Sequence, residues 1–343
     1  MKNLYSHLFK GAMFVAALCV SSPLLAGNEQ RSGEAGATEL LINPWARSSG
    51  FGGANSASIQ GVEALFLNVA GSAFIEGTEV TFSHTKWLAD IDLNSFGITQ
   101  KVGDGALSLV VSSMNFGNIQ RRTVEQPEGT LGTFAPSFLN IHVGYARKFT
   151  ESIYGGVAVK IISESISDLT ANGVAFDAGI QYVTGELKQI RFGIALKNVG
   201  APMSYGGDGF SLRLTTPAGN HVQTFESRSD GFELPTLLNI GGSYDFNFDE
   251  NQLRIVGNFV SNSFSKDIFQ AGMQFSWKKM VMARVGYSYE KTDSNNDVRT
   301  TMFTGLAAGV SFETTEGFAI DYAYRASDPF GAISTLGIRF SVN

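Results

Sequence analysis

Apolar and polar residues alternate along the chain from about residue 77 to the C-terminus. In residues 172–184, for example, Val174, Phe176 and Ile180 fall on one face, and small or polar residues fall on the other. A period of two is that of a β-strand, whose successive side chains point to opposite faces. We identify fourteen such segments, bounded by turn residues: 78–88, 91–101, 105–116, 137–149, 152–165, 172–184, 189–199, 235–248, 251–262, 267–277, 280–290, 299–313, 317–326 and 332–342.

The links between these segments differ in length according to parity. Links after even-numbered segments are short, as at 102–104, 150–151 and 278–279, whereas all the long links, including 117–136 and 200–234, follow odd-numbered segments. Outer-membrane barrels have short periplasmic turns and longer external loops. A soluble β-sandwich would also alternate, but it has no reason to sort its loops in this way. The parity therefore predicts a closed barrel with both chain ends in the periplasm.

The residues before the first predicted strand follow a different pattern. Residues 42–76 are first rich in glycine and alanine and then place Val62, Leu65, Phe66 and Val69 at helical spacing. We interpret 42–76 as a plug inside the barrel and 77–343 as the barrel itself. Residues 27–41 are polar and glycine-rich, which predicts a flexible lead-in.

The first 26 residues have the features of a secretory signal peptide. Lys2 and Lys10 precede or flank a short apolar run, and small residues end at Ala26. The apolar run is too short to span a bilayer, which takes about twenty residues. Cys19 lies within this segment, so the mature chain has no disulfide or thiolate chemistry.

Composition excludes some functions and favours a membrane location. Without Lys2 and Lys10 the chain has 23 basic and 31 acidic residues, a net charge of −8, which disfavours nucleic-acid binding. Only 16% of residues are charged, 12% are aromatic, and aromatic residues recur near the ends of predicted strands, as they do at bilayer interfaces. The predicted fold is all-β: a fourteen-stranded antiparallel transmembrane β-barrel with an N-terminal plug, in the outer membrane of a Gram-negative bacterium.

The plug carries a sequence motif that resembles a known family. The matching residues are Ala46, Arg47, Gly50, Gly52, Gly53, Asn68, Ala70 and Gly71. In this motif the chain resembles the PorV/PorQ family of Bacteroidota outer-membrane proteins, which belong to the wider FadL-like group of fourteen-stranded barrels, although Val69 stands where that family usually has proline. The segment 335–342 is also similar to the last-strand signal of outer-membrane barrels.

The resemblance implies a role in the type IX secretion system. Members of the family there bind the C-terminal signal domain of secreted cargo, receive it from the translocon barrel, or deliver it to the surface sortase. An alternative from a different class is a FadL-like outer-membrane channel for hydrophobic small molecules. The predicted inward faces are mostly small, polar or charged, which favours the secretion role.

The long link 200–234 is the predicted partner-binding loop. It carries apolar side chains that a partner would cover, or that fold over the mouth of the barrel itself. These residues are Met203, Tyr205, Phe210, Leu212, Leu214, Phe225 and Phe232.

Charged residues on the inward faces form a predicted lumen network. They would line a polar path in a transporter, but we favour a paired network that joins plug and wall, because buried charges need partners. The residues are Asp177, Arg191, Lys197, Asp245, Arg254, Arg284, Asp321, Arg325 and Arg339. His142, also inward, is expected to be a hydrogen-bonded lumen residue.

Motifs of known enzymes are absent from the sequence. There is no Gly-x-Ser-x-Gly, His-Glu-x-x-His or phosphate-binding loop. The acidic run 293–297 lacks the glycine and closing glutamate of a calcium loop and is interpreted as a hairpin tip. We therefore expect no enzymatic activity, no cofactor and no metal.

Overall fold

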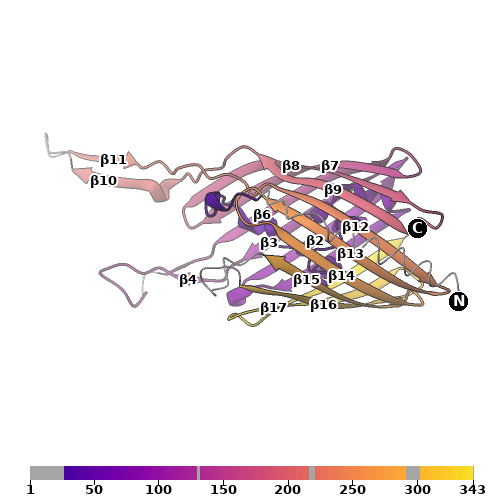
Figure 1. The fold of residues 1–343 in the computed structure, drawn as a ribbon. Coiled ribbons are helices and arrows are strands. Elements are labelled where there is room, and N and C mark those ends of the chain that lie inside the picture. Colours follow the sequence, from indigo (N-terminus) through magenta and orange to yellow (C-terminus); the bar gives the residue numbers. More distant parts are fainter. Residues whose placement is uncertain (1–26, 130–131, 216–220, 291–301, 343) are drawn as a thin grey trace.

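The structure, a computed structural model, describes residues 27–129, 132–215, 221–290 and 302–342. Fourteen strands close into one antiparallel barrel (Figure 1). They are β1 (Thr78–Lys86), β2 (Asp92–Val102), β3 (Gly105–Asn115), β6 (Ser137–Lys148), β7 (Ile153–Ile166), β8 (Leu169–Thr184), β9 (Ile190–Gly200), β12 (Leu237–Phe248), β13 (Asn251–Asn262), β14 (Ile268–Trp277), β15 (Val281–Glu290), β16 (Phe303–Glu313), β17 (Phe318–Ser327) and β18 (Ala332–Val342). The barrel closes between β1 and β18, where Thr78 pairs with Val342. The predicted fold class is confirmed.

The two ends of the barrel differ as the link lengths predict. The short-turn end carries tight links such as 103–104 and 249–250, and the long-loop end carries all the long ones. At the long-loop end two small hairpins extend beyond the barrel on the left of Figure 1. One is β4 (Ile119–Gln120) with β5 (Thr133–Phe134), and the other is β10 (Ser211–Thr215) with β11 (Val222–Glu226). The sequence patterns predict loops without strands in both places.

The alternation of the strands separates the outer and inner surfaces of the barrel. On β8, Phe176 and Ile180 are each 56% exposed and point outward, whereas Asp177 and Gln181 are buried inside. Apolar side chains on the outside are favourable only against lipid, which replaces the water that a soluble barrel would face. Among the residues the structure describes, no helix combines the length and apolar character needed to span a membrane.

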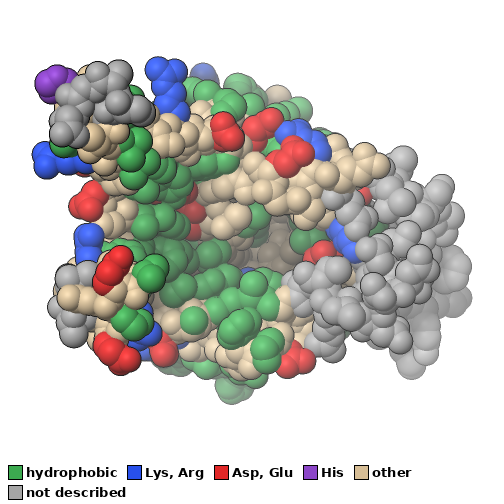
Figure 2. Space-filling view, turned by 90° about the vertical axis from the view of Figure 1, so that its left-hand side faces the viewer, with side chains coloured by type: hydrophobic (Ala, Val, Ile, Leu, Met, Phe, Trp, Pro, Cys, Tyr) green, Lys and Arg blue, Asp and Glu red, His purple; other side chains and the backbone are tan. Residues whose placement is uncertain are grey.

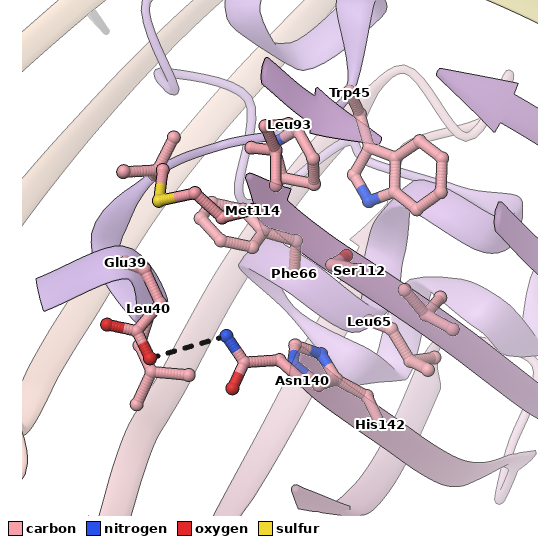
Figure 3. A pocket seen from close by; sticks show the side chains of 13 residues that line it. Glu39, Leu40, Trp45, Leu65, Phe66, Leu93, Ser112, Met114, Asn140 and His142 are labelled. Carbon is pink, nitrogen blue, oxygen red and sulfur yellow. Dashed lines mark hydrogen bonds between the residues drawn. The ribbon is translucent and has the colours of Figure 1, made fainter. Parts of the chain in front are cut away.

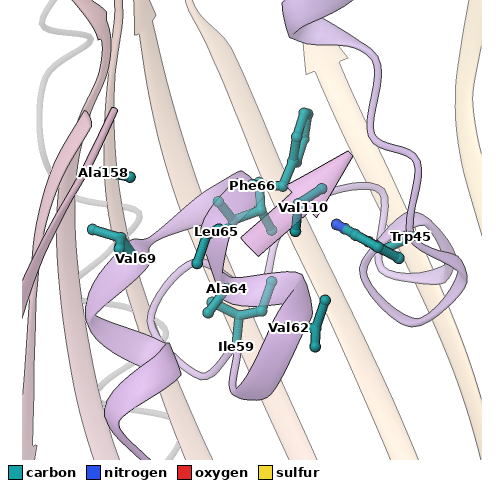
Figure 4. Close-up of a cluster of buried hydrophobic side chains, with 10 residues drawn as sticks. Trp45, Ile59, Val62, Ala64, Leu65, Phe66, Val69, Val110 and Ala158 are labelled. Atoms are coloured by element: carbon teal, nitrogen blue, oxygen red, sulfur yellow. The ribbon is translucent and has the colours of Figure 1, made fainter. Parts of the chain in front are cut away.

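The plug fills the middle of the bore. It consists of α2 (Ala46–Gly50), η3 (Gly61–Glu63), α3 (Ala64–Leu67) and η4 (Val69–Phe74), joined by turns. Trp45, Val62 and Leu65 are almost completely buried in a cluster that also takes Val110 of β3 and Ala158 of β7 from the wall (Figure 4). Burial of an apolar side chain of this size contributes roughly 1.5 to 3 kcal/mol, so this cluster joins the plug to the wall.

The segment before the plug lies at the long-loop end. It is predicted as a flexible lead-in, yet it forms η1 (Glu29–Arg31) and η2 (Thr38–Leu41) and packs against the barrel. Arg31 makes a 2.8 Å ion pair with Glu233 and lies 4.3 Å from the ring centre of Phe264. Leu40 is 2% exposed in a cluster with wall and loop residues.

The segment 27–41 and the end of the C-terminal strand β18 lie toward opposite ends of the barrel. The start of β1 and the end of β18 do meet at the short-turn end. The segment 27–41, however, lies at the opposite end, because the plug carries the chain through the bore before β1 begins. Burial of Leu40 against the wall and the ion pair of Arg31 hold the segment there.

Candidate functional site

The predicted motif residues hold the plug together and against the wall. Arg47 Nε lies 3.1 Å from Glu63 Oε1, which links the first helix of the plug to its second half. Asn68 caps η4 by accepting a 3.2 Å hydrogen bond from the Ala70 N–H, and its amide donates to the Ile180 carbonyl at 3.1 Å. A Cβ atom at Gly50 would lie 3.0 Å from the backbone of Gly309, so only glycine permits this close approach.

A short turn of the plug is fixed by two wall side chains. The Gly52 carbonyl accepts hydrogen bonds from Gln270 Nε2 at 2.7 Å and Ser288 Oγ at 3.1 Å. Gly52 and Gly53 have φ angles of 64° and 83°, which residues other than glycine rarely adopt. The glycines of the motif therefore serve the backbone path of the plug.

The predicted lumen network divides into separate groups. Arg254 forms a two-bond pair with Asp245 at 2.6 and 2.8 Å, and Arg191 lies 3.8 Å from the same carboxylate. Arg339 pairs with Glu313 at 2.8 Å. Ser311 accepts a 2.7 Å hydrogen bond from Arg284 and donates one to Asp321.

Asp177 has a partner that the sequence interpretation missed. Lys160 of β7 lies 2.7 Å from Asp177 Oδ2, and both side chains are buried. The Asn198 backbone N–H also donates to Asp177 at 2.8 Å. Lys160 stands in a cleanly alternating strand, so its inward position was readable from the pattern, but its partner on the neighbouring strand was not.

Three of the predicted lumen cations, Lys197, Arg284 and Arg325, make no ion pair within the described part of the chain. Arg284 donates to Ser311 instead. The Lys197 Nζ atom lies 4.1 Å from the ring centre of Phe66, and the Arg325 guanidinium lies 4.3 Å from that of Phe303. Both line one cavity.

This cavity, the long-loop cavity, opens into the long-loop end of the bore. Its volume is about 440 Å³, and the space-filling view from that end shows a central hollow bordered largely by hydrophobic side chains (Figure 2). Its apolar lining comprises Leu41, Ile42, Phe66, Leu67, Trp87, Leu237, Val260, Ile268, Met302 and Phe303. Its polar lining includes Lys197, Asn239, Gln270, Glu290 and Arg325. The cavity suits a molecule with an apolar body and a polar head.

A second cavity lies on the other side of the plug. It measures about 280 Å³ and is lined mainly by polar residues, among them Arg47, Gln60, Arg254 and Gln274. Gly52 and Gly53 line the long-loop cavity, whereas Phe51 and Asn55 line this one. The turn 51–55 therefore separates the two cavities.

A small pocket of about 20 Å³ lies beside the lead-in (Figure 3). Asn140 Nδ2 donates to Glu39 Oε1 at 3.5 Å there. Burial, and secondarily the carboxylate of Glu164, raises the pKa of Glu39 to about 7. His142, expected to be hydrogen-bonded, is buried and has no hydrogen-bond partner for either ring nitrogen among the described residues.

The predicted partner-binding loop contains two kinds of residue. Met203 and Phe232 pair through their backbones at the base of the loop, and Tyr205 donates a hydrogen bond to Glu164 of the wall. Burial, followed by that hydrogen bond, raises the pKa of Tyr205 above its usual range. Phe210 lies on the turn η6 (Asp208–Phe210). Met203, Tyr205 and Phe232 therefore pack against wall residues in one cluster.

The outer part of the loop is different. Leu212, Leu214 and Phe225 lie on the β10–β11 hairpin and are 56%, 52% and 45% exposed. Leu212 is directly opposite Phe225, so the three side chains share one face of the hairpin. This face is free for a partner within the described structure.

Comparison with known proteins identifies the type of barrel fold. No family model matches the chain, and no curated protein matches it. Among solved structures, the CymD monoaromatic hydrocarbon channel is similar, with a TM-score of 0.60 and 15% identity over 88% of this chain and 98% of that one. The fold is FadL-like.

Two further structures support this assignment. The Pseudomonas putida toluene transporter TodX has a TM-score of 0.58 and 13% identity, covering 88% of this chain and 99% of its own. A FadL homologue of Pseudomonas aeruginosa has a TM-score of 0.52 and 11% identity, covering 87% and 98%. At these identities the likeness concerns the fold alone. The described residues contain no group of three or more His, Cys, Asp or Glu side chains that would hold a metal ion.

Proposed function

We propose that this barrel binds small amphipathic molecules in its long-loop cavity and passes them across the outer membrane. The FadL-like neighbours are described as channels or transporters of toluene and other monoaromatic hydrocarbons. That supports the hydrophobic-channel alternative over the secretion role. We place the long loops outside the cell, in line with the loop parity.

The observation that carries the proposal is the position of Lys197. Its side chain is 3% exposed, and Asp177 on the neighbouring strand β8 is already held by Lys160 and the Asn198 N–H. Charging an amine that is buried among aromatic and aliphatic groups is costly unless a counter-ion is present, and an anionic ligand would supply one. The aromatic and aliphatic lining then takes the apolar body of the same ligand.

A pair of matched ligands tests this assignment. We expect a medium-chain carboxylate to bind the purified barrel, and Lys197→Met to weaken it at least tenfold, while the matching alcohol binds both proteins equally. Lys188→Met is the control, because Lys188 is exposed on a short turn. Equal carboxylate affinity in the Lys197→Met protein, measured by titration calorimetry in detergent, would contradict the proposal.

The exposed face of the β10–β11 hairpin supports a second candidate function. Three large apolar side chains on a projecting hairpin are typical of a surface that a protein partner covers. The resemblance to the PorV/PorQ family suggests type IX partners: the translocon barrel, the signal domain of cargo, or the surface sortase. Such a role would place the protein in a Bacteroidota outer membrane.

A face-specific variant distinguishes this candidate from the channel. Replacing Leu212, Leu214 and Phe225 by serine should leave carboxylate binding intact and abolish capture of those partners in the native bacterium. The control replaces Ser211, Arg213 and Thr224, on the opposite face of the same hairpin, by alanine. Capture that survives the serine substitutions removes the hairpin from any secretion role.

A further inference from the structure

Two buried carboxyl groups join the N-terminal segment to the barrel wall. Glu39 on η2 is 8% exposed, and Glu164 on β7 is 3% exposed. Asn140 donates to Glu39 at 3.5 Å, and Tyr205 donates to Glu164. The second oxygen of Glu164 has no hydrogen-bond partner in the described structure. Asn140 is in register with Ile162 of β7, two residues from Glu164, so the two acids, each with few donors, are buried near the same part of the wall.

No cation neutralises these two acids. Neither makes an ion pair with any described residue. Lys160, on the same strand as Glu164, is held by Asp177 at 2.7 Å, and Lys197 lies over Phe66. His142 of β6 lines the same small pocket as Glu39. Two like charges buried close together cannot both form at low cost, so the pair retains a proton.

The segment that carries Glu39 covers the long-loop cavity. Thr38 and Leu41 line that cavity from the lead-in. Leu40 lies in the cluster formed with Ile162, Met203 and Leu234. On the other side of Glu39, Ala35 forms a backbone bridge with Glu233. The segment is therefore attached at several points to the wall and to the base of the partner-binding loop.

We propose that residues 27–41 form a strap over the long-loop cavity, and that loss of the proton held by Glu39 and Glu164 releases this strap. The inference deepens the proposed function, and rests on it for its consequence, because release exposes the ligand cavity. The strap is closed when one acid of the pair is protonated. When both acids are ionised, the two carboxylates repel each other. Glu39 then leaves the apolar cluster, and its carboxylate is hydrated by water.

The direction of the pH dependence follows from proton binding. Closure raises the pKa of Glu39 from its usual 4.5 to about 7, so the closed strap binds more protons than the released one. Closure is therefore strongest at low pH and weakens as the pH rises between these two values. The ratio of released to closed strap grows by at most about tenfold for each pH unit in that range.

A distance measurement follows the strap without any ligand. The only cysteine, Cys19, lies in the predicted signal peptide, so spin labels are attached through Gln30→Cys on the strap and Leu187→Cys on a short turn, where Leu187 is 72% exposed. We expect one narrow distance distribution at pH 4.5 and a broad one at pH 8. Glu39→Gln, which cannot ionise, should remain narrow at both pH values. Glu34→Gln, an exposed acid of the same strap, should behave as the parent protein does.

Three outcomes would overturn the inference: a parent distribution that does not change with pH, a Glu39→Gln protein that broadens like the parent, or a Glu34→Gln protein that stays narrow. Glu164→Gln removes the secondary cause of the raised Glu39 pKa and leaves its burial, so this variant should broaden less than the parent at pH 8, and it provides the test if Glu39→Gln does not assemble. The failure of the proposed function would look different. If the strap responds to pH but the barrel binds no carboxylate, the pH-dependent release is supported and the proposed channel function is not.

Discussion

Arg47 and Glu63, sixteen residues apart in the plug, form a partly buried ion pair of 3.1 Å. Glu63 also accepts a hydrogen bond from the Ser48 N–H at 3.1 Å, and its side chain is 2% exposed. Burial alone lowers the pKa of Arg47, but the carboxylates of Glu63, Glu79 and Asp321 raise it above the usual range, so the guanidinium remains charged. Through these contacts Glu63 connects the second half of the plug to its first helix.

Neutralising Glu63 should destabilise the plug. In Glu63→Gln the partly buried Arg47 charge loses its nearest carboxylate, and the cost should stay below the roughly 3 to 5 kcal/mol typical of breaking a fully buried pair. We expect a lower unfolding midpoint and higher ion conductance in planar bilayers. Glu34→Gln, at an exposed ion pair, should change neither. A Glu63→Gln barrel with parental conductance and stability would show that the pair is not needed.

Replacing Gly61 by alanine should lower the free energy of unfolding by more than its positive φ angle alone implies. Its φ is 73°, and a Cβ there would collide with the Glu79 carboxylate that accepts a 2.7 Å hydrogen bond from the Val62 N–H. Gly331 has a similar φ of 81°, but a Cβ there meets no atom within 4 Å. Alanine at Gly331 should cost about 1 to 2 kcal/mol from the backbone alone.

Alanine at Gly61 should cost roughly 1 to 3 kcal/mol more, because overpacking adds to the backbone term. Urea unfolding in detergent compares the two variants directly. Equal losses of unfolding free energy would mean that Glu79 moves aside freely and that its bond to the plug contributes little.

The strands were predictable because each has two different environments. Lipid outside and a packed, polar bore inside impose a period of two, as on β8, where Phe176 is 56% exposed and Asp177 is buried. The short hairpins were not predictable in this way. All five residues of β10 are exposed, so burial imposes no pattern on them.

The position of the lead-in was also beyond the sequence pattern. Its glycines and polar residues indicate a mobile segment, and its contacts depend on side chains far along the chain, such as Glu233 and Met203. The ion pairs of the lumen could not be predicted for the same reason. Lys160 and Asp177 meet because β7 and β8 are neighbours in a particular register, which the separate strands do not reveal.

A disulfide between plug and wall should leave the ligand cavity accessible. A Cβ on Gly337 of β18 would lie 3.4 Å from the Ala46 Cβ, near the separation of about 3.8 Å in disulfides. In the Ala46→Cys, Gly337→Cys double variant we expect ready oxidation and unchanged carboxylate affinity, because the long-loop cavity lies on the outer side of the plug. Affinity that falls on oxidation and returns on reduction would mean that the plug must move for binding.

We propose that the long-loop cavity holds an amphipathic anion beside Lys197. Native mass spectrometry of the barrel, extracted from its own membrane in mild detergent, tests this most directly. We expect a co-purifying organic acid with an apolar body, at one copy per barrel, that is lost in Lys197→Met and retained in Lys188→Met. If the parent barrel contains no such acid, or if the Lys197→Met barrel contains as much of it as the parent, Lys197 does not hold an anionic ligand.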